Sequence, residues 1–191
     1  MKSKRLIIGL GNPGQEYEKN RHNLGFRVVQ ALARKENVSF VKEKSFPAHY
    51  GRKNSELFEL HYLLPLTFMN DSGMAMKRCM EYFKVSVQNV LIIADDVALP
   101  YGTLRLRPNG TSGGHNGLKS VEDWLGSNRY SRLKIGVSGP GSIPLKNYVL
   151  QDLSEAEELK WPKIEAASCD LIQSWINQPE LSQSWVLNEL I

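Results

Sequence analysis

Short apolar runs alternate with amphipathic segments along most of this chain, and this alternation limits the folds available to it. The runs are rich in Ile, Leu and Val and are bounded by Gly, Pro, Asn or Asp, which is typical of strands. Between them, apolar residues recur every three or four positions, as at Leu24, Val28 and Leu32, which is typical of helices. Strands that alternate with helices favour a largely parallel sheet with helices on both faces.

We therefore expect an α/β fold: a single three-layer α/β/α domain over residues 1–191 with a mixed, largely parallel, twisted sheet. The predicted strands are Arg5–Gly9, Val38–Lys42, Leu57–Leu64, Val90–Ala94, Thr103–Arg107 and Leu133–Val137. The predicted helices are Asn23–Glu36, Ser72–Phe83, Gly117–Gly126 and Ser154–Trp175. The last of these opens with a capping-box pattern, and no element is predicted after Trp175.

The composition is that of a globular protein, because 41% of the residues are hydrophobic and 23% are charged. A net charge of +4 permits a nucleic-acid partner without requiring one. No apolar stretch approaches the roughly 18 residues of a membrane span. The apolar segment behind the basic N-terminus is too short for a signal peptide. The two cysteines form no C-x-x-C motif. We expect a cytoplasmic, monomeric protein.

The sequence from Gly9 to Gly14, GLGNPG, matches the G-x-G-x-x-G motif that follows the first strand of dinucleotide-binding folds. In that motif, backbone N–H groups meet a pyrophosphate at a helix N-terminus. Here Pro13 has no N–H to donate, and a charged segment delays the helix until about Asn23. We therefore reject a dinucleotide site and expect no cofactor.

The sequence from Gly110 to Gly114, GTSGG, matches the G-x-S-x-G motif of the nucleophile elbow in α/β-hydrolases. That fold requires an acid and a histidine after the serine, but the only later histidine is His115, three residues from Ser112. A glycine-rich loop that admits a ligand or a close backbone is the better interpretation. Neither H-x-H nor H-E-x-x-H occurs, so we expect no metal site.

Polar side chains cluster directly after several predicted strands and at the start of one predicted helix. The segments are Asn12, Tyr17, His22 and Asn23; Thr67–Asn70; Asp95 and Asp96; and His115 and Asn116. Ligands of open α/β sheets bind beyond the carboxyl ends of the strands, so we expect these segments to share one rim. Structural alternatives stay open. Asn70 or Asn116 could cap a helix, Asp95 and Asp96 could form a turn, and His22 could lie on the surface.

Taken together in order and spacing, these segments resemble the signatures of bacterial peptidyl-tRNA hydrolases. The resemblance spans roughly Leu6 to Gly141 and weakens through the C-terminal helix. It rests on GLGNPG with Tyr17 and Arg21-His22-Asn23, on Thr67-Phe68-Met69-Asn70 with Ser72-Gly73, on Asp95-Asp96 with Leu99-Pro100-x-Gly102, and on Gly113-Gly114-His115-Asn116-Gly117-Leu118-Lys119.

The resemblance implies hydrolysis of the ester that joins a peptide to the 3′ end of tRNA, which recycles tRNA from prematurely released peptidyl-tRNA. It implies that His22 is the catalytic base, that Asp95 holds and polarises it, and that Asn12 distinguishes blocked from unblocked aminoacyl groups. Positions that match contacts to the tRNA end or the peptide are Tyr17, Phe68, Asn70 and Asn116, and those that match the cleft wall are Met69 and His115. Basic positions that match a clamp on the acceptor-end phosphate are Arg105, Arg107 and Lys134.

The residue types fit this chemistry. No Ser or Cys nucleophile passes the tests above, which leaves a water activated by a histidine that a carboxylate orients. An amide of Asn70 or Asn116 could stabilise the oxyanion. Arg105 and Arg107 alternate on one predicted strand and share a face, which suits phosphate contacts without base specificity but also suits a solvated strand face.

One departure from the family pattern concerns the third signature. The family usually has a second Asp three residues after Asp95, where this chain has Ala98. We expect activity to survive, but the support around the histidine pair is in question. The main alternative function is a non-catalytic RNA-binding protein on the same fold. Loss of His22, Asp95, Asn70 or Asn116 would favour that alternative, and all four residues are present.

Overall fold

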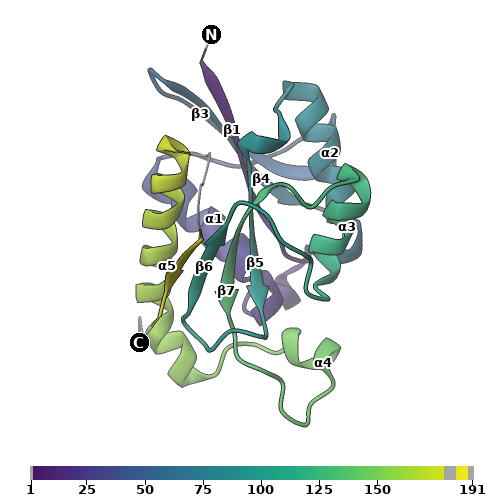
Figure 1. Cartoon of the computed structure of the whole chain (residues 1–191), viewed down its shortest axis with the longest axis vertical. Helices are drawn as coiled ribbons and strands as arrows, with labels where there is room; N and C mark the ends of the chain where they lie inside the picture. The colour runs from purple at the N-terminus through teal and green to yellow at the C-terminus, as the bar shows by residue number, and fades with distance from the viewer. Residues whose placement is uncertain (1, 179–183, 189–191) are drawn as a thin grey trace.

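The computed structural model describes residues 2–178 and 184–188, and a mixed sheet forms the centre of this part of the chain (Figure 1). The eight strands lie in the order β2-β3-β4-β1-β5-β7-β6-β8. Their bounds are β1 Ser3–Gly9, β2 Val41–Lys42, β3 Ala48–Asn54, β4 Phe58–Pro65, β5 Val90–Asp96, β6 Leu104–Arg107, β7 Ser131–Gly136 and β8 Trp185–Leu187. The α-helices are α1 Leu24–Lys35, α2 Ser72–Phe83, α3 Asn116–Leu125, α4 Leu145–Val149 and α5 Glu155–Asn177, and short 3-10 helices span Gln15–Tyr17, Arg21–Asn23, Met69–Asp71 and Val87–Asn89.

The direction of the strands confirms the mixed α/β sheet and locates its parallel part. β4, β1, β5 and β7 run parallel to one another at the centre, whereas β2, β3, β6 and β8 pair antiparallel on the two flanks. The carboxyl ends of the four parallel strands therefore meet at one edge of the sheet. Segments that follow these strands are brought together there, which is where open α/β sheets bind ligands.

Helices cover both faces of the sheet, as the three-layer prediction requires. Figure 1 shows α1 and α5 on one side and α2 and α3 on the other. Successive side chains of β1 enter two separate hydrophobic clusters: Ile7 joins the cluster under α1 and α5, and Leu6 and Ile8 join the cluster under α2 and α3. This alternation is the period of two expected for a strand that is buried on both faces.

The glycines of the N-terminal motif allow the start of α1 to pack against the end of β1. A Cβ atom on Gly9 would lie 2.3 Å from the carbonyl oxygen of Gly25, and one on Gly25 would lie 2.4 Å from the carbonyl oxygen of Ile93. Either side chain would force the backbones apart. Gly9, the first glycine of the motif, therefore has a packing explanation at the place where the chain passes from the sheet into α1.

Most predicted elements match the structure within a few residues, and the differences lie in weakly patterned segments. Ser72–Phe83 is observed with the predicted bounds, and Ser154 caps α5 with a complete capping box. The predicted strand Val38–Lys42 shrinks to β2, because Val38 and Phe40 instead pack against the cluster under α1 and α5. β3, α4 and β8 were not predicted. No helix among the described residues is long and apolar enough to cross a membrane.

Candidate active site

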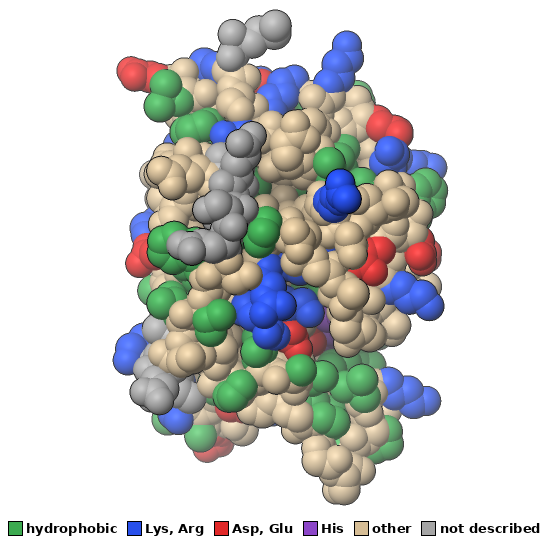
Figure 2. Space-filling model, in the orientation of Figure 1, with side chains coloured by type: hydrophobic (Ala, Val, Ile, Leu, Met, Phe, Trp, Pro, Cys, Tyr) green, Lys and Arg blue, Asp and Glu red, His purple; other side chains and the backbone are tan. Residues whose placement is uncertain are grey.

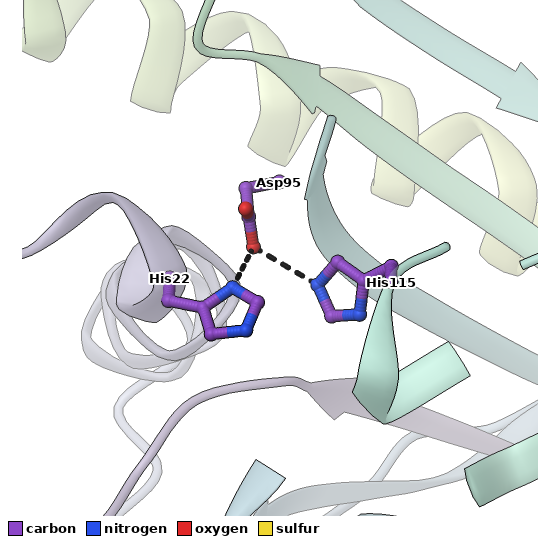
Figure 3. Close-up of side chains that lie close together, drawn as sticks. All are labelled: His22, Asp95 and His115. Atoms are coloured by element: carbon purple, nitrogen blue, oxygen red, sulfur yellow. Dashed lines mark hydrogen bonds and ion pairs between the residues drawn. The ribbon is translucent and has the colours of Figure 1, made fainter. Parts of the chain in front are cut away.

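Three side chains from distant parts of the chain meet at the carboxyl edge of the sheet (Figure 3). His22 lies in the 3-10 helix Arg21–Asn23 between β1 and α1, Asp95 lies near the end of β5, and His115 precedes α3. His22 and Asp95 are 8% and 3% exposed, so His22 is not a surface residue. Asp95 belongs to a strand end and not to an exposed turn.

Arg21 fixes the 3-10 helix that carries His22. Its guanidinium donates to Glu157 at 2.6 Å and to the carbonyl of Asp152 at 2.8 Å, and it lies over the ring of Tyr148. These partners belong to α4, to α5 and to the segment between them. The helix that carries His22 is therefore held to the segment that follows β7.

One carboxylate oxygen of Asp95 accepts hydrogen bonds from both histidines. Oδ1 of Asp95 lies 2.8 Å from Nδ1 of His22 and 3.0 Å from Nε2 of His115 (Figure 3). The other nitrogen of His115, Nδ1, accepts hydrogen bonds from the backbone N–H groups of Gly117 and Leu118 and so caps α3. Because Nδ1 of His115 accepts, the proton of the neutral ring lies on Nε2 and is donated to Asp95.

Asp95 is held as a carboxylate by its two neighbours. Burial alone raises the pKa of Asp95, but the charges of and hydrogen bonds from His22 and His115 outweigh burial and hold its pKa well below the usual value. Asp95 is thus an acceptor at neutral pH, and it directs the Nδ1–H of His22 toward itself. Nε2 of His22 makes no hydrogen bond within the described residues, which leaves it as an acceptor.

His22, Asp95 and His115 are also the group among the described residues whose ligand atoms lie close enough to hold a metal ion, within 4.8 Å of one another. The cap on α3 opposes that use. To ligate a metal through Nε2, His115 would have to move its proton to Nδ1, where it would meet the N–H groups of Gly117 and Leu118. In the observed arrangement His115 therefore offers a proton, and not a lone pair, at Nε2.

Asn12 is locked in orientation by its neighbours. Its side-chain Oδ1 accepts from the backbone N–H of Met69 at 2.8 Å. Its backbone N–H donates to Oδ1 of Asn23, and Nδ2 of Asn23 donates back to its carbonyl, both at 2.9 Å. With Oδ1 occupied, Nδ2 is the donor that Asn12 has left for a ligand. Asn23 belongs to the first signature, but nothing in the sequence indicated this positioning contact.

A cavity of about 280 Å³ opens beside His22 and His115. Of the predicted site residues it is lined by His22, Asp95, His115, Asn116 and Lys134. The rest of the wall comes from the glycine-rich loop Ser112–Gly114, from Asp96 and Val97, and from three residues of α4, namely Leu145, Lys146 and Val149. The glycine-rich loop thus borders a ligand-sized space, as predicted. The α4 wall was missed, because a five-residue helix gives little periodic signal.

The remaining predicted contacts to the peptide and the tRNA end do not line this cavity. Met69 is buried, and its sulfur is the atom that a Cβ on Gly117 would meet first, which places it beside the start of α3. Phe68 and Asn70 are exposed next to Met69, and Tyr17 is half-buried. Neither asparagine proposed as a helix cap has that position, since Asp71 precedes α2 and His115 precedes α3.

The three predicted clamp residues share one face of the sheet next to the cavity. Arg105 and Lys134 are directly opposite each other on β6 and β7, and Arg107 follows on the same face of β6. Leu104, Leu106 and Leu133, which alternate with them, enter the cluster under α1 and α5. Figure 2 shows Lys and Arg side chains gathered over this region, beside acidic and histidine side chains.

Ala98, the departure from the family pattern, has no side-chain group that could hydrogen-bond to Asp95. The side chain of Ala98 is exposed, and its backbone N–H donates to Oδ1 of Asp96 at 2.9 Å. Within the described residues, the partners of the Asp95 carboxylate are His22 and His115. The second group that orients Asp95 is therefore an imidazole that is itself fixed by a helix cap.

Comparison with known proteins gives one consistent family. The family model for peptidyl-tRNA hydrolase matches residues 6–188. Similar proteins include the peptidyl-tRNA hydrolases of Shouchella clausii, 41% identical over 93% of this chain and 96% of that protein, and of Geobacillus kaustophilus, 39% identical over 92% and 94%. The crystal structure of peptidyl-tRNA hydrolase from Acinetobacter baumannii aligns with a TM-score of 0.78 at 32% identity and covers 94% of this chain and 95% of that one.

Proposed function

Because the chain belongs to the peptidyl-tRNA hydrolase family and hydrolyses the ester of peptidyl-tRNA, we propose that His22 is the base that activates the attacking water. The observation that supports this role is the hydrogen bond of 2.8 Å from Nδ1 of His22 to Asp95, which leaves Nε2 as an acceptor on a side chain that lines a ligand-sized cavity. Base catalysis of this kind is worth about 10²–10⁴-fold.

The reaction proceeds in two proton transfers through the same nitrogen. The water oxygen bonds to the carbonyl carbon of the ester while its proton passes to Nε2 of His22. The bond from that carbon to the ribose oxygen then breaks, and the proton moves from Nε2 to the leaving oxygen. The products are the peptide with a free carboxyl group and tRNA with its 3′ hydroxyl restored. Asp95 stabilises the imidazolium that exists between the two transfers.

Asparagine side chains recognise the acyl end of the substrate. Nδ2 of Asn12 donates to the carbonyl oxygen of the group that blocks the amino end, because its Oδ1 already accepts from the N–H of Met69. Asn116 lines the cavity with His22 and is better placed to donate to the oxyanion than Asn70, which does not line it. Tyr17, Phe68 and Met69 contact the peptide or the terminal nucleotide around this cavity.

The tRNA is held by its phosphates on the face formed by Arg105, Arg107 and Lys134. Phosphate contacts give affinity that falls with salt and carries no base sequence, which suits an enzyme that accepts many tRNAs. The protein works in this proposal as a cytoplasmic, single-domain monomer without metal or cofactor. The intact group of His22, Asp95, Asn70 and Asn116 favours hydrolysis over the non-catalytic RNA-binding alternative.

The proposal is tested by comparing two substrates that differ in one acetyl group. The purified protein, without added metal or nucleotide, is incubated with an N-acetyl-aminoacyl-tRNA and with its unacetylated form, and free tRNA is measured. We expect rapid release from the acetylated substrate and little from the other. Binding of tRNA without release from either substrate would favour the RNA-binding alternative.

A further inference from the structure

Asp96, the neighbour of the proposed catalytic Asp95, places its carboxylate in contact with two residues of the proposed clamp. Its Oδ2 lies 3.1 Å from Nζ of Lys134 and 3.3 Å from Nη2 of Arg105. Its Oδ1 accepts the backbone N–H of Ala98, so the carboxylate is held from three directions. Its side chain is only 10% exposed. Asp95 and Asp96 both line the cavity, but consecutive residues of a strand point to opposite faces, so Asp95 contacts the histidines and Asp96 contacts the clamp cations.

The register of the sheet sets this contact. Lys134 is opposite Arg105 on β6 and opposite Ala94 on β5, and Asp96 follows Ala94 on the same face. The three charged groups therefore stand side by side across β5, β7 and β6. Arg105 keeps an unused donor, since its Nε is buried and has no hydrogen-bond partner within the described residues. In the part of the chain that the structure describes, Arg107 has no ion-pair partner.

This arrangement sets the charge that a phosphate meets. Arg105 and Lys134 contribute two positive charges and Asp96 one negative charge, so the group carries a net charge of +1. An incoming phosphate must compete with a carboxylate that is already in contact with both cations and fixed by the backbone. In the free protein, the same carboxylate also offsets the repulsion between the two neighbouring cations.

We propose that Asp96 is a specificity-determining residue that competes with tRNA phosphates for Arg105 and Lys134 and so limits how tightly any tRNA is held. The proposal rests on the phosphate clamp of the proposed function. Its reason lies in the reaction: the phosphates are the same in peptidyl-tRNA and in the tRNA product. Tight phosphate binding would stabilise substrate, transition state and product alike, and would slow product release. A weak clamp leaves the discrimination to the acyl contacts at Asn12.

Asp96→Asn tests the proposal, because the amide keeps an acceptor for the N–H of Ala98 but removes the charge. The affinity for deacylated tRNA is measured at several salt concentrations for the wild type, for Asp96→Asn and for Asp170→Asn. Asp170 is a matched control: it lies on α5, on the opposite side of the sheet, its side chain is 73% exposed, and its substitution changes the net charge equally.

We expect Asp96→Asn to bind deacylated tRNA about 3- to 10-fold more tightly at low salt, with the difference shrinking as salt rises. The slope of log affinity against log salt becomes steeper by about one. KM for the N-acetyl-aminoacyl-tRNA falls with the dissociation constant. Asp170→Asn behaves like the wild type. In a background of Arg105→Gln with Lys134→Gln, Asp96→Asn no longer raises the affinity for tRNA, because the two cations for which Asp96 competes are absent.

Two outcomes would overturn the proposal. Unchanged or weaker tRNA binding by a folded Asp96→Asn would mean that Asp96 only positions the two cations. An equal gain in Asp170→Asn would mean that net charge and not the local contact sets the affinity. The wild type is measured before any variant. If its affinity for tRNA did not depend on salt, the proposed phosphate clamp itself would be wrong.

Discussion

Nε2 of His115 lies 3.0 Å from Oδ1 of Asp95, the same oxygen that accepts from His22. His115 joins two functions in one ring, since its other nitrogen caps α3. The helix cap therefore decides which nitrogen carries the proton, and through it the orientation of Asp95. The resemblance implies that His115 belongs to the cleft wall, and His115 does line the cavity. Its contacts also make it a positioning residue for the proposed catalytic pair.

Replacing His115 separates these two functions. His115→Asn retains a good capping side chain but is too short to reach Asp95, so we expect near-normal stability with a kcat about 10-fold lower. His115→Ala loses the cap as well, which lowers the free energy of unfolding by about 0.5–2 kcal/mol. Denaturant unfolding and single-turnover hydrolysis of N-acetyl-aminoacyl-tRNA measure the two effects. A wild-type kcat in the folded Asn variant would show that Asp95 does not need His115.

Asn12→Asp tests how the enzyme distinguishes blocked from free amino groups. The carboxylate still accepts from the N–H of Met69, but the donor for the substrate is gone and a free, positively charged amino group is attracted. We expect the ratio of kcat/KM for acetylated over unacetylated substrate to fall at least about 10-fold, with little change in tRNA affinity. Equal losses on both substrates would contradict the assigned role of Asn12.

His61 makes stability depend on pH far from the active site. Burial lowers the pKa of His61 to about 4, despite the nearby Glu59 carboxylate, and its Nδ1 pairs with the hydroxyl of Tyr50 at 2.8 Å. An unfolded histidine titrates near pH 6.5. Between these two values the unfolded chain binds a proton that the folded chain excludes. The free energy of unfolding therefore falls as pH decreases from about 6.5 to about 4, by up to about 3 kcal/mol.

His61→Gln removes this titration. We expect the variant to be less stable at pH 7 but to lose less stability between pH 7 and pH 4 than the wild type does. His49→Gln is the control, since it replaces a histidine that is exposed on β3 and not buried. Chemical unfolding at several pH values measures the slopes. Equal slopes for the wild type and His61→Gln would show that His61 is not responsible.

The sequence predicted the elements whose patterns are strong and the rim where the polar residues meet. Leu24, Val28 and Leu32 mark α1 by spacing alone, and Asp95 follows a buried strand as a rim residue should. The three layers and the mixed sheet followed from these patterns. β3 was missed because its sequence, AHYGRKN, is largely polar, and it becomes a strand through its antiparallel pairing with β4.

Contacts between rim residues could not be predicted, because they depend on geometry and not on residue type. The strand ends placed His22 and Asp95 on one rim, but their pairing as base and carboxylate came only from the family resemblance. Nothing in the spacing indicated that His115 would reach the same oxygen while capping α3, or that Asp96 would enter the clamp of Arg105 and Lys134. Such contacts are set by a tautomer, a cap and a strand register, which emerge when distant segments pack together.

The most direct test of the account is the turnover of His22→Ala on N-acetyl-aminoacyl-tRNA, measured beside its affinity for deacylated tRNA and beside His49→Ala as a control for loss of an exposed histidine. If His22 is the base, we expect hydrolysis to fall by at least about 10²-fold while tRNA affinity stays near that of the wild type and His49→Ala is fully active. Near-normal hydrolysis by His22→Ala would contradict the assignment of the base and, with it, the proposed mechanism.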